Sequence, residues 1–318
     1  MGNITSKFPA SHTESPQRGR STSRSDRRSQ RKMEEEVVFP MPSPVTSGNS
    51  SSKGKTSRKL KLIDGRGFND GELVNPKYML PVDDLECDRL TIQHYSLRNY
   101  SAPIKEQLEK GISVLDSGCG TGIWCLEMGT DYPNSTFVGT DIAASFPIDI
   151  HPSNVSFFNA DTTVELPFPD ETFDYVFQRM LTLAFSVDAW ESAIKELIRV
   201  TKPGGFVELV LHTLSARNIN GRMSLQLGDR LIEHGLKDVT TSYKVIPTGW
   251  SGRIGELTGQ VLQAAIPATK PVLLQIMAIS EEEFDAMATE ALREFPQYKT
   301  VNDVWYAFGR KPMEKEGV

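Results

Sequence analysis

The sequence contains few cysteines and no long apolar run. Only three of its 318 residues are cysteines (Cys87, Cys119 and Cys125), and no two of them form a C-x-x-C pair. This set excludes a disulfide scaffold and a zinc ribbon, so we expect a reducing compartment and no metal site. No stretch approaches the ~18 consecutive apolar residues of a membrane-spanning helix. The N-terminus also lacks the apolar core of a secretory signal peptide. The sequence therefore predicts a cytoplasmic protein without a transmembrane helix.

Charge is distributed unevenly along the chain. The formal net charge is −6, yet residues 1–60 hold 12 Lys and Arg against 5 Asp and Glu. Residues 61–318 hold the other 23 basic and 36 acidic residues. An acidic body disfavours a broad phosphate-binding face, so we do not expect nucleic acid as a substrate.

Residues 1–60 predict a disordered tail, because they are rich in Ser, Arg, Lys, Pro and Gly and cannot bury a core. The tail begins with Met1-Gly2-Asn3-Ile4-Thr5-Ser6, which matches the myristoylation pattern M-G-x-x-x-[ST] and predicts lipidation of Gly2. One acyl chain anchors a protein only marginally, and the basic residues between Arg18 and Lys32 would add attraction to anionic lipid. We therefore expect a cytoplasmic protein with peripheral membrane contact through the tail. A chance match and, less favoured, a nuclear localisation signal are the alternatives.

Residues 61–318 predict one α/β domain, because short apolar strands alternate with helical patterns. The clearest segment covers residues 112–124, where the apolar strand Ile112–Leu115 leads into a turn with glycines at 118, 120 and 122. A helical pattern follows from Thr121 to Gly129. Glycines let the backbone approach a ligand closely, and a helix N-terminus offers free N–H groups.

The glycine spacing separates two kinds of cofactor. A dinucleotide fold requires G-x-G-x-x-G, whereas this loop has glycines at alternate positions and Asp116 just before them. In this it resembles the first motif of class I S-adenosylmethionine-dependent methyltransferases, and a hydride-transfer enzyme is disfavoured. The resemblance implies a Rossmann-like α/β fold with S-adenosyl-L-methionine as cofactor. The sheet of that fold is seven-stranded and mostly parallel, with an antiparallel last strand.

The resemblance also assigns cofactor-binding residues at successive strand ends. Asp141 ends the strand Thr136–Thr140 and would bind the ribose hydroxyls. Asp161 and Thr162 follow the strand Val155–Phe158 and would contact the adenine, and Gln178 follows Phe173–Phe177 at the methionine end. The full implied set is Asp116, Gly118, Gly120, Gly122, Asp141, Asp161, Thr162 and Gln178.

Flanking segments narrow the group. The helix Asp188–Val200, the turn Thr201–Gly205 with its Lys-Pro-Gly-Gly sequence, and the strand Phe206–Leu211 continue the family pattern. Blocks within residues 86–98, 249–257 and 303–312 resemble fungal methyltransferase-domain proteins, a group that includes LaeA-like regulators of secondary metabolism. We expect a helical insertion between a sixth strand (Ser242–Ile246) and the last strand (Asp303–Pro312). Its apolar runs indicate either a lid over a hydrophobic small molecule or a protein-docking face.

No catalytic residue is assigned, because methyl transfer from a sulfonium needs orientation and often no protein base. The weak candidates are His212 as general base, Arg179 as a substrate contact and Tyr95 as a wall of the site. Each has an ordinary structural alternative: a hydrogen bond, a salt bridge and helix packing, respectively. His94 lies next to Tyr95 on the same expected helix. Trp250 is expected to pack the insertion onto the sheet. Cys119 and Cys125 are expected to be buried fillers.

The absence of two motifs restricts the substrate. No Asn/Asp-Pro-Pro-Tyr/Phe motif follows the fourth strand, and no Pro-Cys nucleophile is present. Both absences disfavour methylation of nucleic-acid bases. We therefore expect a methyltransferase that acts on a small-molecule or lipid-like acceptor. The alternative is a LaeA-like regulatory protein that binds the cofactor but acts through protein partners.

Overall fold

The computed structural model describes residues 60–63, 65–69, 80–143, 145–182, 184–212 and 223–313. The predictions for residues 1–59, including lipidation of Gly2, lie outside the described residues and stay predictions. No helix in the described ranges is long and apolar enough to cross a membrane.

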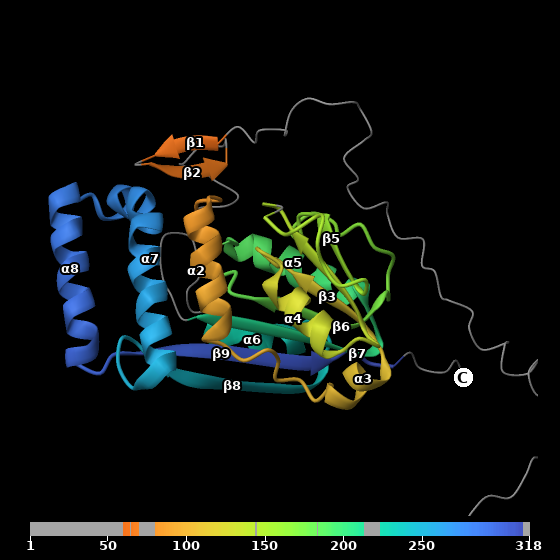
Figure 1. Cartoon of the computed structure of the whole chain (residues 1–318). Coiled ribbons are helices and arrows are strands. Elements are labelled where there is room, and N and C mark those ends of the chain that lie inside the picture. The colour runs from red at the N-terminus through yellow and green to blue at the C-terminus, as the bar shows by residue number, and fades with distance from the viewer. Residues whose placement is uncertain are drawn as a thin grey trace, which may run out of the picture. The chain divides into compact units, whose positions relative to one another are not determined.

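Strands and helices alternate along most of the described chain (Figure 1). In chain order the elements are β1 (Leu60–Ile63), β2 (Arg66–Asn69), α2 (Asp84–Tyr95), α3 (Lys105–Lys110), β3 (Ser113–Ser117), α4 (Ile123–Asp131), β4 (Thr136–Asp141), β5 (Val155–Asn159), β6 (Phe173–Arg179), α5 (Val187–Val200), β7 (Thr201–His212), α6 (Met223–Glu233), β8 (Lys237–Pro247), α7 (Gly252–Met277), α8 (Glu281–Gln297) and β9 (Val301–Arg310).

Seven strands form one sheet in the order β5-β4-β3-β6-β7-β9-β8. β3 to β7 pair in parallel, and β9 pairs antiparallel with both β7 and β8. This confirms the predicted seven-stranded, mostly parallel sheet with an antiparallel last strand. Because parallel strands end at the same edge, the C-terminal ends of β3, β4, β5 and β6 meet there. Ser117 at the end of β3 is level with Thr140 of β4.

Both faces of the sheet are covered, which explains why its central strands are almost continuously apolar. Successive residues of β6 alternate between the two faces: Tyr175 and Phe177 belong to one buried cluster, and Val176 belongs to the other. The first cluster includes Leu108 of α3 and Trp124 of α4. The second includes side chains of α5 and α6, among them Trp190, Ile194, Leu227 and Leu231.

β7 begins earlier than the sequence predicted. The Lys-Pro-Gly-Gly segment was expected to be a turn, but β7 starts at Thr201, which is paired with Phe173. An irregularity in the pairing accommodates Gly204, whose φ is +78°. The N–H of Gly204 donates to the carbonyl of Lys311 over 2.8 Å, so backbone pairing continues through this segment.

The predicted helical insertion is present between β8 and β9 and consists of α7 and α8. α7 packs against α2 and β8, whereas α8 packs against α7 (Figure 1). Val261, Ala268 and Val272 are among the buried apolar side chains of α7. Their spacing of seven and four residues places them on one helix face. α8 begins with a capping box between Ser280 and Glu283.

A short hairpin, β1 and β2, is joined to the start of α2 through Asp83. Its carboxylate caps the helix by accepting from the N–H of Glu86 at 3.0 Å, and it also accepts two hydrogen bonds from Arg66, at 2.7 and 2.8 Å. The pairing with Arg66 lowers the pKa of Asp83 to about 2. The sequence patterns had not singled out this hairpin.

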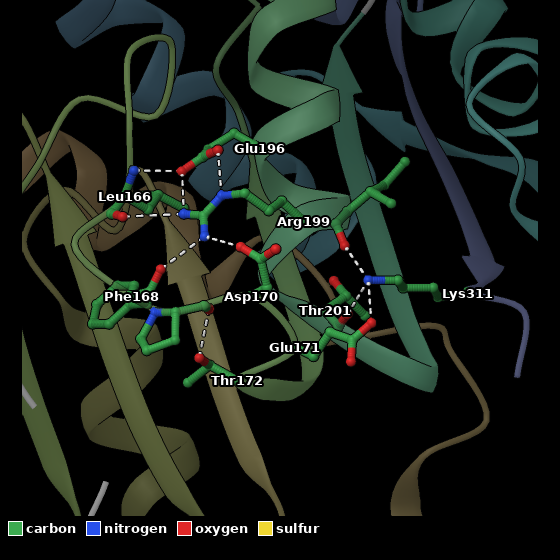
Figure 2. Close-up of polar contacts among 11 residues, drawn as sticks. Leu166, Phe168, Asp170, Glu171, Thr172, Glu196, Arg199, Thr201 and Lys311 are labelled. Atoms are coloured by element: carbon green, nitrogen blue, oxygen red, sulfur yellow. Dashed lines mark hydrogen bonds and ion pairs between the residues drawn. The ribbon is translucent and has the colours of Figure 1, made fainter. Parts of the chain in front are cut away.

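A second arginine fastens the loop before β6 to the end of α5 (Figure 2). Arg199 donates to both carboxylate oxygens of Glu196, to Asp170, and to the carbonyls of Leu166 and Phe168. Every guanidinium nitrogen of Arg199 therefore has an acceptor. This network lies at the N-terminal edge of the sheet, opposite the strand ends that meet at the glycine loop.

Candidate functional site

The loop between β3 and α4 needs its glycines for local reasons. Gly118, Gly120 and Gly122 have φ angles of +76°, +56° and +74°, in the left-handed region where a side chain costs roughly 1–2 kcal/mol. A Cβ at Gly118 would lie 2.6 Å from Leu181, and one at Gly122 would lie 2.5 Å from the ring of Phe157. Packing within the protein thus fixes two of the three glycines.

Gly120 has a more open surrounding. Within 4 Å, a Cβ there would meet only Leu90 of α2, at 3.5 Å. The main-chain N–H of Gly120 donates to Oδ2 of Asp141 over 2.8 Å, and Oδ1 of Asp141 accepts from the N–H of Ala143 over 2.7 Å. The glycine loop and the end of β4 therefore meet at Asp141, the residue predicted to bind the ribose.

Two other predicted residues meet behind the loop. The hydroxyl of Ser117 lies 2.7 Å from that of Thr162 and donates to Oε1 of Gln178 over 3.3 Å. All three side chains are buried. Nε2 of Gln178 is buried without a hydrogen-bond partner, and so is the hydroxyl of Thr140 on the neighbouring strand.

Asp161 has a local role in the structure. Its Oδ1 accepts from the N–H of Thr163 at 3.0 Å and from the Thr163 hydroxyl at 2.6 Å. These bonds close a turn after β5 and hold the carboxylate in place. Asp161 directly precedes Thr162, so both residues predicted to contact the adenine follow the end of β5.

Asp116 and Arg179 form the charged part of the site. Asp116 is 3% exposed, and burial raises its pKa to about 7 although the nearby Arg179 acts in the opposite direction. Burial also lowers the pKa of Arg179. The thiol of Cys125 donates to Asp116 over 3.7 Å. Cys125 is fully buried, as predicted, whereas Cys119 is partly exposed.

Arg179 contacts a histidine that in turn contacts a glutamate. Its Nη2 lies 2.6 Å from Nδ1 of His94, and Nε2 of His94 lies 2.5 Å from Oε2 of Glu127. The sequence analysis named Arg179 and His94 as candidates but missed Glu127. A charged residue within the largely apolar helix α4 was the available signal.

The remaining candidates differ in their surroundings. Tyr95 is 61% exposed, and its ring lies nearly perpendicular to that of His94, with the centroids 4.9 Å apart. Burial, aided by the charge of Arg89, lowers the pKa of His212 to about 4, so its imidazole is neutral at pH 7. Trp250 donates from its ring nitrogen to the carbonyl of Thr300 over 2.6 Å, which joins the segment before α7 to the residue that precedes β9. Packing of the insertion onto the sheet by Trp250 stays a prediction.

The residues at these strand ends suit a polar cofactor. Six buried polar side-chain atoms of the described residues have no hydrogen-bond partner. Three of the six, on Thr140, Gln178 and Arg179, lie at the C-terminal ends of β4 and β6. Buried polar groups are rarely left unpaired, so this grouping indicates a ligand that pairs with them. Gly120 adds a backbone position that a ligand can approach closely.

The sheet order, the loop with glycines at alternate positions and Asp141 at the end of β4 are features of the class I S-adenosylmethionine-dependent methyltransferases, and this chain is similar to proteins of that class. A family model described as a methyltransferase domain matches residues 114–205, from β3 into β7. S-adenosylmethionine is the cofactor of this class. The residues that would hold it are those of the glycine loop with Asp141, Asp161, Thr162 and Gln178.

Fungal proteins are among the relatives. The N-methyltransferase sirN of Leptosphaeria maculans is 29% identical over 225 residues, which cover 60% of this chain and 78% of that protein. The N-methyltransferase gliN of Aspergillus fumigatus is 26% identical over 279 residues, or 74% of this chain and 96% of that protein. The secondary metabolism regulator laeA of Monascus pilosus is 33% identical over 138 residues, but these cover only 42% of this chain and 36% of that protein. The predicted relationship to the fungal LaeA-like group is confirmed.

Proposed function

We propose that this chain transfers the methyl group of S-adenosylmethionine to a nitrogen atom of a small molecule. The contact between Gly120 and Asp141 is the observation that supports the proposal most, because it joins the glycine loop to the acid that would bind the ribose. The nitrogen acceptor is inferred from sirN and gliN, which are both N-methyltransferases. Their matches extend over 78% and 96% of their own lengths.

In this proposal the protein acts mainly by holding two reactants in line. When bound, S-adenosylmethionine would supply the methyl group, which the nitrogen lone pair of the acceptor would displace from sulfur while sulfur kept the electron pair. The methylated nitrogen would then release a proton. Such alignment lowers the barrier without a strong base. His212 stays the candidate for accepting the proton, but with a pKa of about 4 its neutral imidazole is a weak base.

The second candidate function is regulation through a protein partner. It is favoured by the 33% identity to laeA, a secondary metabolism regulator. Both functions would use the same cofactor site, so cofactor binding alone does not separate them. A lipid-like amine is the other acceptor class that fits the sequence-based expectation.

The first test is calorimetric titration of the full chain with S-adenosylmethionine, S-adenosylhomocysteine and NAD. We expect both methionine nucleosides to bind, NAD not to bind, and Asp141→Ala to abolish binding. Asp174→Ala is the matched control, because Asp174 also accepts a backbone N–H, from Ser113 at 2.9 Å, but at the opposite edge of the sheet. Binding of NAD alone, or equal loss in both variants, would refute the proposed site.

The second test measures transfer of a labelled methyl group to a panel of small amines, matched alcohols and an amine-bearing lipid in micelles. Transfer to an amine with an equal amount of S-adenosylhomocysteine formed would support the proposal. Transfer only to alcohols would contradict the nitrogen acceptor. Cofactor binding without turnover, together with a stable protein partner, would favour the regulatory function.

A further inference from the structure

Three polar side chains from different elements form a hydrogen-bonded series that ends at the candidate site. Glu127 lies on α4, His94 in the last turn of α2, and Arg179 at the end of β6. Oε2 of Glu127 is 2.5 Å from Nε2 of His94, and Nδ1 of His94 is 2.6 Å from Nη2 of Arg179. His94 is only 2% exposed. The three residues are far apart in sequence, so the fold itself brings them together.

The positions of the hydrogen atoms between these three side chains follow from the chemistry of the guanidinium of Arg179 and the carboxylate of Glu127. A guanidinium group only donates, so Nδ1 of His94 must accept from Arg179. The imidazole is then neutral, and its Nε2–H donates to Glu127. The second carboxylate oxygen of Glu127 accepts from Nδ2 of Asn99 at 2.8 Å, which fixes its orientation. Burial and the charge of Arg179 lower the pKa of His94, so the neutral form persists at pH 7.

Within the described residues, the guanidinium of Arg179 makes one hydrogen bond, to His94, and lies over the ring of Phe177. Its Nη1 is buried and has no hydrogen-bond partner, and among the described residues no carboxylate lies within ion-pair distance of its guanidinium. Arg199, by contrast, has an acceptor for every nitrogen (Figure 2). A cation with a buried, unpaired donor calls for an anion, and a carboxylate fits a guanidinium best because it can accept two parallel hydrogen bonds.

We propose that Arg179 binds a carboxylate in the candidate site, and that His94 and Glu127 are positioning residues that hold its guanidinium toward that group. The assignment rests on the proposed function, because S-adenosylmethionine carries a carboxylate at its methionine end. An acceptor molecule is the other source of the same chemistry.

The helix that carries His94 also covers the glycine loop. Leu90 lies one turn before His94 on α2 and is the nearest side chain to an added Cβ at Gly120. Positions four residues apart share a helix face, so one face of α2 meets both the loop and Arg179. The position of α2 therefore determines both how the glycine loop is covered and where the guanidinium of Arg179 points.

The test compares two ligands that differ in the proposed contact. S-adenosylhomocysteine carries the amino-acid carboxylate, and 5′-methylthioadenosine lacks the whole amino-acid group. For Arg179→Gln in the full chain we expect a roughly tenfold to hundredfold loss of affinity for S-adenosylhomocysteine, with 5′-methylthioadenosine unaffected. Arg179→Lys keeps the charge and should lose less. Thermal unfolding of each variant confirms that it is folded.

The positioning role is tested on His94. His94→Leu should weaken the binding of S-adenosylhomocysteine but not that of 5′-methylthioadenosine. His94→Gln should retain much of the affinity, because the glutamine amide can accept from Arg179 and donate to Glu127. Arg66→Gln is the control. It breaks the contact with Asp83 at the start of α2 and leaves the hydrogen bonds between Glu127, His94 and Arg179 intact. If His94→Leu and Arg66→Gln both lowered the affinity for the two nucleosides by the same factor, His94 would only pack the helix. That result overturns its assigned role.

A final arm separates the two carboxylate sources. Sodium benzoate is titrated into the chain saturated with S-adenosylhomocysteine. One outcome is that Arg179→Gln leaves the affinity ratio of S-adenosylhomocysteine to 5′-methylthioadenosine unchanged and abolishes benzoate binding. In that case Arg179 binds the carboxylate of the acceptor. An unchanged ratio without any benzoate binding to the wild-type chain overturns the proposal. Failure of the wild-type chain to bind either nucleoside would instead refute the proposed function and remove the basis of this assignment.

Discussion

Gly122 lies directly against the ring of Phe157. A Cβ added at Gly122 would come within 2.5 Å of two ring carbons, and this ring is itself stacked on Phe146 with centroids 5.0 Å apart. The glycine therefore has a packing role as well as a conformational one. Gly120, two residues earlier, has the same backbone handedness but no such tight neighbour.

This difference predicts opposite outcomes for two matched substitutions. Gly122→Ala should destabilise the fold by roughly 2–4 kcal/mol, because backbone strain adds to overpacking. Gly120→Ala should cost only about 1 kcal/mol and leave the chain folded, yet it should weaken S-adenosylhomocysteine binding by narrowing the approach to the loop. Denaturant unfolding and calorimetry measure the two effects. Equal stability of the two variants would contradict the packing argument.

Asp116 predicts a pH-dependent stability. Its pKa is about 7 in the fold, against about 3.9 for an unperturbed carboxyl. The folded state therefore keeps a proton that the unfolded state releases, and this contribution to stability is lost as the pH rises from about 4 to about 7. Relative to wild type, Asp116→Asn should gain up to roughly 4 kcal/mol between pH 4 and pH 8. The check is urea unfolding of both proteins across this range; a constant difference would refute the perturbed carboxyl.

Glu208 predicts a large loss of stability from a small change. It is fully buried and accepts hydrogen bonds from the N–H groups of Ser101 and Ala102 and from the hydroxyl of Tyr175, all between 2.8 and 2.9 Å. Glu208→Gln would place an amide NH₂ group, which is a donor, against N–H and O–H groups that also donate. The free energy of unfolding should fall by roughly 2–4 kcal/mol. Tyr175→Phe removes one donor only and should cost about 1 kcal/mol. Comparable midpoints in thermal unfolding would argue against the network.

Trp250 predicts an effect on the insertion that leaves the cofactor site alone. Trp250→Phe removes the 2.6 Å hydrogen bond to Thr300 and should reduce stability by about 1 kcal/mol. The affinity for S-adenosylhomocysteine should change less than twofold. Hydrogen exchange should increase in α7 and at the start of β9. A large loss of cofactor affinity would mean that the insertion also shapes the glycine loop.

Local sequence patterns were sufficient to predict the parallel strands of the large sheet and the glycine loop, because buried parallel strands are continuous apolar runs and left-handed turns require glycine. They did not predict the β1–β2 hairpin or the early start of β7. Asp141 was predictable for a related reason: the ends of neighbouring parallel strands meet at one edge. The contact of His94 with Glu127 was not predictable, since it depends on how α2 is rotated and where it crosses α4. Polar side chains such as Glu86 and Arg89 are buried on α2, so its hydrophobic pattern does not mark the inner face. For the same reason Tyr95, one position along the helix from the buried His94, is exposed.

The position of β9 between β7 and β8 has a consequence for synthesis of the chain (Figure 1). β8 ends at Pro247 and its only sheet partner in the described structure begins at Val301. A ribosome adding roughly 5–20 residues per second needs several seconds to cover that interval. Throughout this time the nascent β8 lacks the neighbour that joins it to the sheet, and its edge is open to pairing with other chains.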